Sequence, residues 1–419
     1  MVENGEIENL KEIRAQFPIL KHWVYLNAAD QAPPARYWMD AIRECLVFYE
    51  AGKIEDVAPY GEATHPFLTT VFFETIKKAA KLLHAKKEEV TNNYRVMTAA
   101  NLIINDLIKW ERGDNVVFTD LDYPSIPYIL LNLHRKKGVE LRRIKNVNGR
   151  IPLEEMEKAI DDRTKLVVIN HTMPWSGFTY PNLREISDIA HEHGAYVLDD
   201  AFQTVGAIDV NVHKEGVDFL LTGSYKWQCG PEGAGIFYIR EELIEEFDPD
   251  FRNYLWADIK GGIPFESPEH DNIKHWDYPL VKNANRFDMG TCVTPILFGW
   301  NATLDFFLEI GMDRIERRVR KLGSYLIDRL YEIGCKVITP EDKRERHGLI
   351  VYTTGDLKLD KKSFERFNVP PAGEKPIKVS LRYVGGVGGI RASTHFFNTK
   401  EDIDYLIETQ EKVLREEKG

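Results

Sequence analysis

Residues 193–240, HGAYVLDDAFQTVGAIDVNVHKEGVDFLLTGSYKWQCGPEGAGIFYIR, decide the fold class of this chain. Three apolar runs in this stretch have the length and the aliphatic and aromatic content of buried strands. They cover residues 195–200, 218–224 and 234–240. The first run ends in Asp200, and Lys226 follows the second run by two residues. Ligands of open α/β sheets bind outside the carboxyl ends of the strands, so both residues are candidates for a ligand site.

The same pattern extends toward the N-terminus. Further short strands are expected at residues 116–120, 141–145 and 165–171. Between the last of these and residue 195 lies NLREISDIAHEHG, an amphipathic helical pattern that ends in Gly194, a typical residue after a helix C-terminus. Strands that alternate with helices predict an α/β fold with a mostly parallel sheet.

After about residue 295, long helices and then short strands replace this alternation, and a last helix is expected from Thr399. This order predicts a second, smaller α+β domain. We therefore expect a large domain over residues 30–290 and a small domain formed by residues 1–29 and 291–419. Residues from about 241 to 285 are rich in aromatics, Pro and Gly, and we expect a long, irregular excursion there.

The composition excludes several function classes. The formal net charge is -11, which argues against a nucleic-acid-binding protein because those usually carry a basic surface. The chain has 4 cysteines without CxxC spacing, so neither a zinc site nor a disulfide framework is expected, and no metal site is predicted. We see no secretory signal and no apolar stretch of membrane-spanning length. A cytoplasmic protein that does not bind membranes is the expectation.

Asp200 and Lys226 together suit pyridoxal phosphate (PLP). The carbonyl carbon of this cofactor forms a Schiff base with a lysine, and its ring nitrogen needs a carboxylate to stay protonated. A lysine released from the cofactor is also placed to act as a base toward the substrate Cα proton. The pair alone is not specific, because an Asp at a strand end is more often a cap and a single Lys is more often a solvated charge.

The flanking residues are specific. The opening stretch resembles the Asp-x-x-Gln-x-x-Gly … Asp-Phe … Lys … Gly-Pro-x-Gly-x-Gly region of the class V aminotransferase group of fold-type I PLP enzymes. This group includes cysteine desulfurases, kynureninases, isopenicillin-epimerase-like proteins and cysteine C–S lyases. RFDMGT (286–291) and IRASTHFFNTKEDID (390–404) resemble two further blocks of the group, and the resemblance starts at YLNAADQAPP (25–34). It implies a large domain with a mostly parallel, seven-stranded sheet, plus a smaller C-terminal α+β domain.

The resemblance also implies roles for single residues at the cofactor ring. Lys226 would hold PLP as a Schiff base and act in catalysis, and Asp200 would pair with the ring nitrogen. Gln203 would approach the phenolic oxygen, and Tyr123 would stack on the ring. His171 follows a buried strand, where it would either help to position the cofactor or satisfy a buried backbone group.

At the phosphate, the resemblance points to the turn that contains Met97 and Thr98, whose amides and hydroxyl would hold the anion. Relatives usually carry a further hydroxyl three residues before the lysine, but Gly223 stands there in this chain. Thr222 or Ser224 would have to replace it, and the sequence does not choose between them.

For the substrate, Arg391 matches the arginine that grips the α-carboxylate, and Asn27 is a second candidate for substrate binding. Gly290 and Thr291 match a loop that reaches the phosphate of the partner subunit. The resemblance therefore implies a homodimer with shared active sites and an amino-acid substrate.

Two departures from the group bear on the reaction. Cysteine desulfurases need a nucleophilic Cys on the loop before the carboxylate-binding arginine, and this loop, LRYVGGVGGIRAS, has none. Persulfide transfer by that mechanism is therefore not expected. The run of glycines in the loop indicates either a flexible lid or a plain hairpin turn. In addition, Pro174 stands where relatives often place an Asn against the cofactor oxygen.

We therefore expect a PLP-dependent enzyme that acts on an α-amino acid. Transamination is favoured because it needs no further catalytic group. A C–S lyase-type β-elimination and an epimerisation are the alternatives. A reading from another class is a non-catalytic binding module on the same fold.

Overall fold

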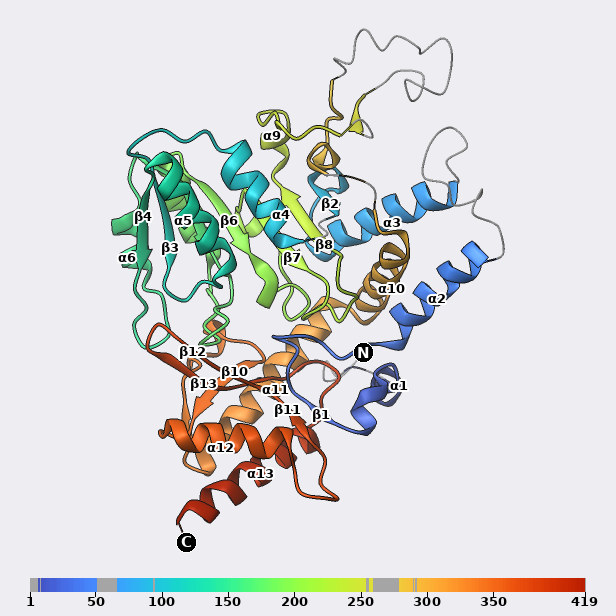
Figure 1. The fold of residues 1–419 in the computed structure, drawn as a ribbon, viewed down its shortest axis with the longest axis vertical. Helices are drawn as coiled ribbons and strands as arrows, with labels where there is room; N and C mark the ends of the chain where they lie inside the picture. Colours follow the sequence, from blue (N-terminus) through green and yellow to red (C-terminus); the bar gives the residue numbers. More distant parts are fainter. Residues whose placement is uncertain are drawn as a thin grey trace, which may run out of the picture.

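A seven-stranded sheet forms the centre of the larger part of the molecule, in the order β2-β8-β7-β6-β5-β3-β4 (Figure 1). β8 pairs antiparallel with both β2 and β7, and the remaining pairs are parallel. The strands are β2 (Val90–Asn92), β3 (Asn115–Thr119), β4 (Glu140–Ile144), β5 (Thr164–Ile169), β6 (Tyr196–Asp200), β7 (Phe219–Gly223) and β8 (Gly235–Ile239). The computed structural model describes residues 7, 9–50, 66–92, 95–253, 256–258, 279–288, 290 and 292–418.

Helices cover both faces of this sheet. Because side chains alternate along a strand, Val197 of β6 packs into one hydrophobic cluster and Leu198 into another. The Leu198 cluster contains residues of α4 and α5, whereas the Val197 cluster contains residues of α6 and α7. The helices are α4 (Val96–Asn101), α5 (Ser125–Lys137), α6 (Leu153–Ala159), α7 (Leu183–Glu192), α8 (Val212–Glu215) and α9 (Glu241–Ile244), and a π-helical turn, Leu102–Leu107, follows α4. The fold is therefore the α/β fold that the strand pattern predicted.

The local signals in the sequence explain several element ends. The buried residues of α7, Leu183, Ile186, Ser187 and Ala190, lie three or four positions apart and form one apolar face. Just beyond this helix, Gly194 has a φ of 72°, a left-handed conformation that glycine adopts without strain. The helix therefore stops where the sequence indicated.

A second, antiparallel sheet, in the order β12-β13-β10-β9, lies below the first in Figure 1. Helices α11 and α13 pack together beside it, and α12 contacts both α13 and the sheet. These elements are β9 (Lys336–Val337), β10 (Leu349–Thr353), β12 (Ser380–Val384), β13 (Val387–Ser393), α11 (Met312–Glu332), α12 (Leu357–Asn368) and α13 (Lys400–Lys418). The apolar run at 377–383 is divided between two strands, because its first two residues form β11 (Ile377–Lys378), which pairs with β1 (Val24–Tyr25).

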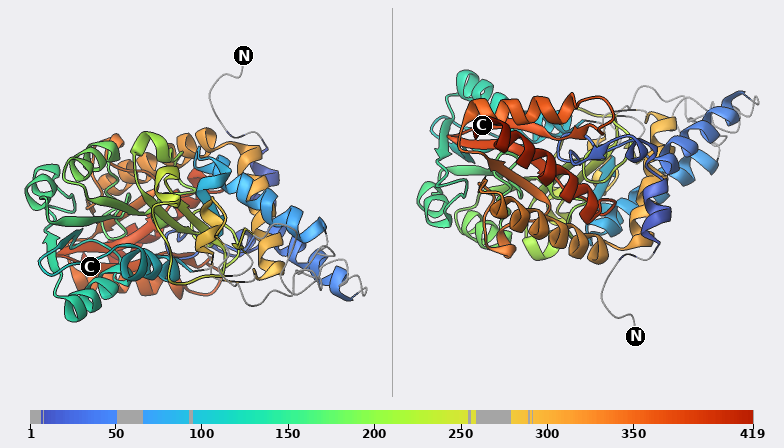
Figure 2. Two further views of the ribbon diagram at one scale, coloured as in Figure 1. Left: turned by 90° about the horizontal axis from the view of Figure 1, so that it is seen from above. Right: turned by 90° about the horizontal axis from the view of Figure 1, so that it is seen from below.

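The N-terminal helices α2 (Arg36–Glu50) and α3 (Pro66–Leu82) pack against α10 (Thr294–Ile310). Both views of Figure 2 show this group at one end of the molecule. A short helix, α1 (Leu10–Ala15), precedes them. Within the described residues, no helix is both long and apolar enough to cross a membrane.

The glycine run between β12 and β13 forms a hairpin turn. Gly385 and Gly386 have φ angles of 61° and 80°, as a two-residue turn of this kind requires. The carbonyl oxygen of Gly385 accepts a hydrogen bond of 2.9 Å from the side chain of Asn146, in the loop after β4. The hairpin tip is therefore bound to the larger part of the molecule. In this conformation the glycine run forms a hairpin turn and not an open lid.

Candidate active site

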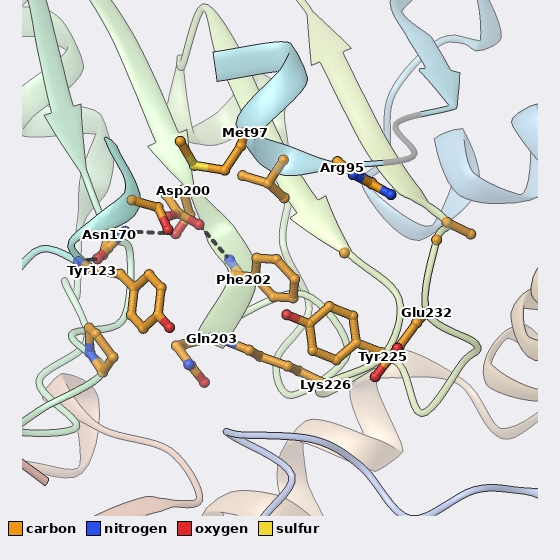
Figure 3. Close-up of a pocket in the computed structure, with 16 residues that line it drawn as sticks. Arg95, Met97, Tyr123, Asn170, Asp200, Phe202, Gln203, Tyr225, Lys226 and Glu232 are labelled. Carbon is orange, nitrogen blue, oxygen red and sulfur yellow. Dashed lines mark hydrogen bonds between the residues drawn. The ribbon is translucent and has the colours of Figure 1, made fainter. Parts of the chain in front are cut away.

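A cavity of about 730 Å³ opens at the carboxyl ends of β6 and β7, where the sequence placed the site. This volume lies within the range of about 300–1,000 Å³ that small-molecule sites occupy. Figure 3 shows Tyr123, Asp200, Phe202 and Lys226 around this space. The structure thus brings together side chains from positions 123 to 226 that the sequence predicted as one site.

Lys226 is almost fully buried, with 8% of its surface exposed. Its Nζ lies 4.3 Å from the ring centroid of Phe202 and 5.2 Å from that of Tyr123. Burial and, to a smaller extent, the positive charge of Arg391 lower the pKa of Lys226 to about 8, and the negative charge of Asp200 opposes both effects. A buried lysine with a lowered pKa supplies the neutral amine that a nucleophile needs.

Asp200 ends β6 and is buried at the same cavity. Its Oδ1 accepts a long hydrogen bond of 3.4 Å from the backbone N–H of Phe202. Burial raises the pKa of Asp200 to about 6, and the charge of Lys226 opposes this rise. A buried carboxylate with so few partners can still accept a strong, charged hydrogen bond from a ligand.

Asn170 is a site residue that sequence reasoning missed. Its side-chain oxygen accepts a hydrogen bond of 3.0 Å from the backbone N–H of Tyr123, and its side-chain nitrogen donates one of 3.3 Å to the backbone oxygen of Asp200. It lies just after the end of β5, so the rule that selected Asp200 would also have selected Asn170. This amide fixes the stacking aromatic relative to the carboxylate.

Tyr123 is 43% exposed. It stacks on Trp175 with ring centroids 5.8 Å apart and an interplanar angle of 10°. Trp175 therefore holds the ring of Tyr123 at the cavity wall, where a flat ligand could stack on it.

Gln203 lines the cavity, but both ends of its amide are engaged elsewhere. Its nitrogen donates to the backbone oxygen of Ala29 at 2.9 Å, and its oxygen accepts from the indole N–H of Trp227 at 2.8 Å. Gln203 therefore connects the N-terminal segment to the residue that follows Lys226.

The predicted phosphate ligands do not all reach the cavity. Met97 lines it, whereas Thr98 is exposed and lies outside the lining. The hydroxyl of Thr222 lies 3.5 Å from the side-chain nitrogen of Gln228, and that of Ser224 donates to the backbone oxygen of Pro231. Both side chains are fully buried, and neither lines the cavity.

Arg391 is buried beside the cavity, with 2% of its surface exposed. Its Nη1 donates to the backbone oxygen of Pro174 at 3.1 Å, and its Nη2 lies 3.9 Å from Oδ1 of Asp30. Its Nε is buried without a hydrogen-bond partner. Burial and the nearby charge of Arg382 lower the pKa of Arg391 to about 10. A guanidinium with spare donors suits a carboxylate ligand.

Asn27 lies next to this arginine but is bound within the protein. Its side-chain oxygen accepts a hydrogen bond of 2.7 Å from Ser380, and its nitrogen donates a long one of 3.4 Å to Asp30. Asp30 thus contacts both predicted substrate-binding residues, a link that sequence reasoning did not find.

The remaining predicted residues lie elsewhere. His171 is buried on the opposite face of the sheet, next to Asp199 and Glu215. Gly290 does not line the cavity, and Thr291 lies outside the described residues.

Comparisons with known proteins identify the family of this chain. The family model described as aminotransferase class-V matches residues 29–406. The chain belongs to this family. It is a PLP-dependent enzyme of the class V group, and its buried lysine, buried carboxylate and exposed aromatic face fit that cofactor.

The relatives of this class V enzyme include cysteine desulfurases. A probable cysteine desulfurase of Halalkalibacterium halodurans is 27% identical over 97% of this chain and 98% of the relative. A cysteine desulfurase of Salmonella agona is 28% identical, also over 97% and 98%.

Two solved structures show the same fold. The apo cysteine desulfurase of Thermococcus onnurineus NA1 has a TM-score of 0.79 at 23% identity, over 97% of this chain and 98% of the other. The cystine C–S lyase C-DES, in complex with its product cysteine persulfide, has a TM-score of 0.78 at 19% identity, over 94% and 99%. At these identities the likeness shows the fold-type I architecture alone.

Proposed function

We propose that this enzyme cleaves the C–S bond of cysteine or cystine by β-elimination. The observation that carries the proposal is the cavity itself: it contains the buried amine of Lys226 and the carboxylate of Asp200, and no cysteine is among its described lining residues. The curated relatives that act on cysteine support a sulfur-containing substrate. The alternative of β-elimination is therefore favoured over transamination, which the sequence alone had favoured.

The thiols of the chain support elimination over persulfide transfer. Cys45, Cys229 and Cys335 are buried away from the cavity, and Cys292 is half-buried. Burial raises the pKa of all four, to about 11 for Cys45 and about 12 for Cys335, so each remains a protonated thiol near neutral pH. The loop before Arg391 has no cysteine and forms the docked hairpin described above.

The residues of the chain would then take the following roles. Arg391 binds the α-carboxylate of the substrate through donors that its present contacts leave free. Lys226 removes the Cα proton as a neutral amine. Asp200 would hold the ring nitrogen of the cofactor in its protonated form, and Tyr123 would offer its ring for stacking. When bound, PLP supplies the electron sink for the pair that remains at Cα.

The overall reaction balances without an oxidant. Cysteine and water give pyruvate, ammonia and hydrogen sulfide. Cystine and water give pyruvate, ammonia and cysteine persulfide. In both cases the sulfur leaves from Cβ with the electron pair of the broken C–S bond.

Product analysis tests this proposal. PLP-loaded enzyme is incubated with cysteine or cystine, and pyruvate, alanine, sulfide and protein-bound persulfide are measured, with Lys226→Ala and Cys292→Ser as controls. We expect pyruvate in equal amount to the released sulfur, loss of both with Lys226→Ala, and no loss with Cys292→Ser. Alanine with a persulfide on the protein, or a keto acid that retains its sulfur, would instead identify a desulfurase or a transaminase.

A homodimer with shared sites is part of the proposal. Thr222 and Ser224 point away from the cavity, so a partner hydroxyl at position 291 would supply the phosphate contact that one chain lacks. Sedimentation of the PLP-loaded enzyme tests the dimer. Mixed dimers of Lys226→Ala and Thr291→Ala chains, which regain one intact site, test the sharing.

A further inference from the structure

His171, Asp199 and Glu215 converge at one buried point on the face of the sheet opposite the cofactor cavity. One ligand atom from each lies within 4.8 Å of the others. They come from three separate segments: the end of β5, β6 and the last residue of α8. Because successive side chains of β6 point to opposite faces, Asp199 faces this cluster while its neighbour Asp200 lines the cavity.

Each of the three side chains has a buried polar atom without a hydrogen-bond partner in the structure. These atoms are Nδ1 of His171, Oδ2 of Asp199 and Oε2 of Glu215. The side chains of His171 and Asp199 are only 6% and 0% exposed. A buried polar atom without a partner costs roughly 1–3 kcal/mol, so three at one point indicate a ligand that satisfies them together.

The distances point to the same conclusion. Nδ1 of His171 lies 3.7 Å from Asp199 and 3.9 Å from Glu215, beyond hydrogen-bond length. In contrast, the two side chains lie within hydrogen-bond distance of each other in four other histidine–carboxylate pairs of the described chain. They are His84–Asp209 at 2.8 Å, His191–Asp218 at 2.8 Å, His193–Asp162 at 2.7 Å and His213–Glu89 at 3.0 Å.

We propose that His171, Asp199 and Glu215 bind one divalent transition-metal ion. Metal–nitrogen and metal–oxygen bonds of about 2.1 Å place tetrahedral ligands about 3.4 Å apart. The two distances from Nδ1 of His171, to Oδ2 of Asp199 and to Oε1 of Glu215, are a few tenths of an ångström longer. An imidazole and two carboxylates are ligands of zinc and manganese, and the two negative charges balance a divalent cation. The side chain of Glu215 is 15% exposed, so the ion can enter from solvent beside it.

Such an ion would stabilise the cofactor site from the opposite face of the sheet. His171 directly follows Asn170 in the chain, and Asp199 directly precedes Asp200. On the cavity side, Asn170 donates a hydrogen bond to the backbone oxygen of Asp200. The ion would tie the ends of β5 and β6 together without touching the substrate. Its role is structural, so its effect is expected in stability and cofactor retention.

The competing occupant is a proton on His171, which would leave an ordinary salt-bridged cluster. Metal binding to the full-length, PLP-loaded enzyme distinguishes the two, after removal of metals with a chelator. Bound Mn²⁺ is counted by the loss of the electron paramagnetic resonance signal of the free ion, and the thermal midpoint is measured with and without Mn²⁺ or Zn²⁺. Glu215→Gln removes a ligand, and Asp209→Asn, in the exposed pair with His84, is the matched control.

We expect one Mn²⁺ per chain, at least tenfold weaker binding in Glu215→Gln, and an ion-dependent rise in the thermal midpoint that this variant loses and Asp209→Asn keeps. Wild-type protein that binds no ion, or Glu215→Gln that binds it equally well, overturns the proposal. X-ray absorption of the zinc-loaded wild type gives a test that needs no variant. Nitrogen and oxygen neighbours with imidazole scattering support the site, and sulfur neighbours contradict it.

Discussion

A Cβ atom at position 223 would lie 2.3 Å from Cζ of Phe202, so Gly223 and the ring of Phe202 occupy one space between them. Gly223 is the position where relatives carry a phosphate-binding hydroxyl. The same ring lies 4.3 Å from Nζ of Lys226. The ring of Phe202 can therefore lie beside Lys226 only because position 223 has no side chain.

This relationship predicts a compensating pair of substitutions. Gly223→Ser should push Phe202 into the cavity, lower the free energy of unfolding by about 1–3 kcal/mol and weaken PLP binding. Adding Phe202→Ala should restore most of both losses, because the smaller side chain frees the space. Equilibrium unfolding and PLP titration of the two single variants and the double variant measure this coupling. If the two losses simply add, the close approach of the two positions does not matter for the site.

The lowered pKa of Lys226 predicts how the rate of PLP uptake by the apo-protein depends on pH. Burial and Arg391 place this pKa at about 8, and only the neutral amine attacks the cofactor. The rate should therefore reach a plateau above about pH 8 and fall roughly tenfold for each pH unit below it. Stopped-flow absorbance measures this profile.

The charge of Arg391 gives this prediction a direct check. Removing it with Arg391→Met should raise the pKa of Lys226 and move the plateau to higher pH, because the larger of the two nearby positive charges that lower this pKa is gone. A profile that stays in place after this substitution would show that Arg391 does not act on the lysine.

Arg391 is also predicted to set substrate affinity. Arg391→Lys keeps the positive charge but loses the planar pair of donors. A hydrogen bond to a charged group contributes about 1.5–3 kcal/mol, so kcat/KM should fall roughly 10- to 100-fold, mainly through KM. Asp30→Asn is the matched control, since it removes the acidic group 3.9 Å from the guanidinium. It should lower KM, and a rise instead would show that Asp30 helps to hold Arg391 for the substrate.

The sequence was sufficient to predict that Asp200 and Lys226 share one site, because the ends of strands are visible in the local sequence pattern. The apolar runs before Asp200 and Lys226 form β6 and β7, and both side chains face one cavity. Asn170 obeys the same rule, since it directly follows the end of β5.

Other parts of the site depend on contacts between distant residues, which no local pattern reveals. Thr222 and Ser224 turn toward Gln228 and Pro231 because of how the chain folds after Lys226. Phe202 appeared only as a spacer between Asp200 and Gln203, although its ring forms a wall of the cavity.

The three proposed metal ligands also come together only through contacts between distant parts of the chain. The sequence predicted no metal site, because the cysteines have no zinc spacing. The two carboxylates stand far from His171 along the chain, so no local pattern joins the three residues. Only the folded chain brings the three side chains together. The helix is four residues long, and its sequence alone does not show where Glu215 points.

The central claim is that PLP is held covalently by Lys226, and borohydride reduction tests it most directly. Reduction of the PLP-loaded enzyme makes the link between cofactor and lysine permanent, and peptide mass spectrometry then locates it. We expect the cofactor on Lys226, together with loss of the visible absorption of the bound cofactor in Lys226→Ala. A label on another lysine, or no label on a protein that remains folded, would contradict the assignment of this cavity as the active site.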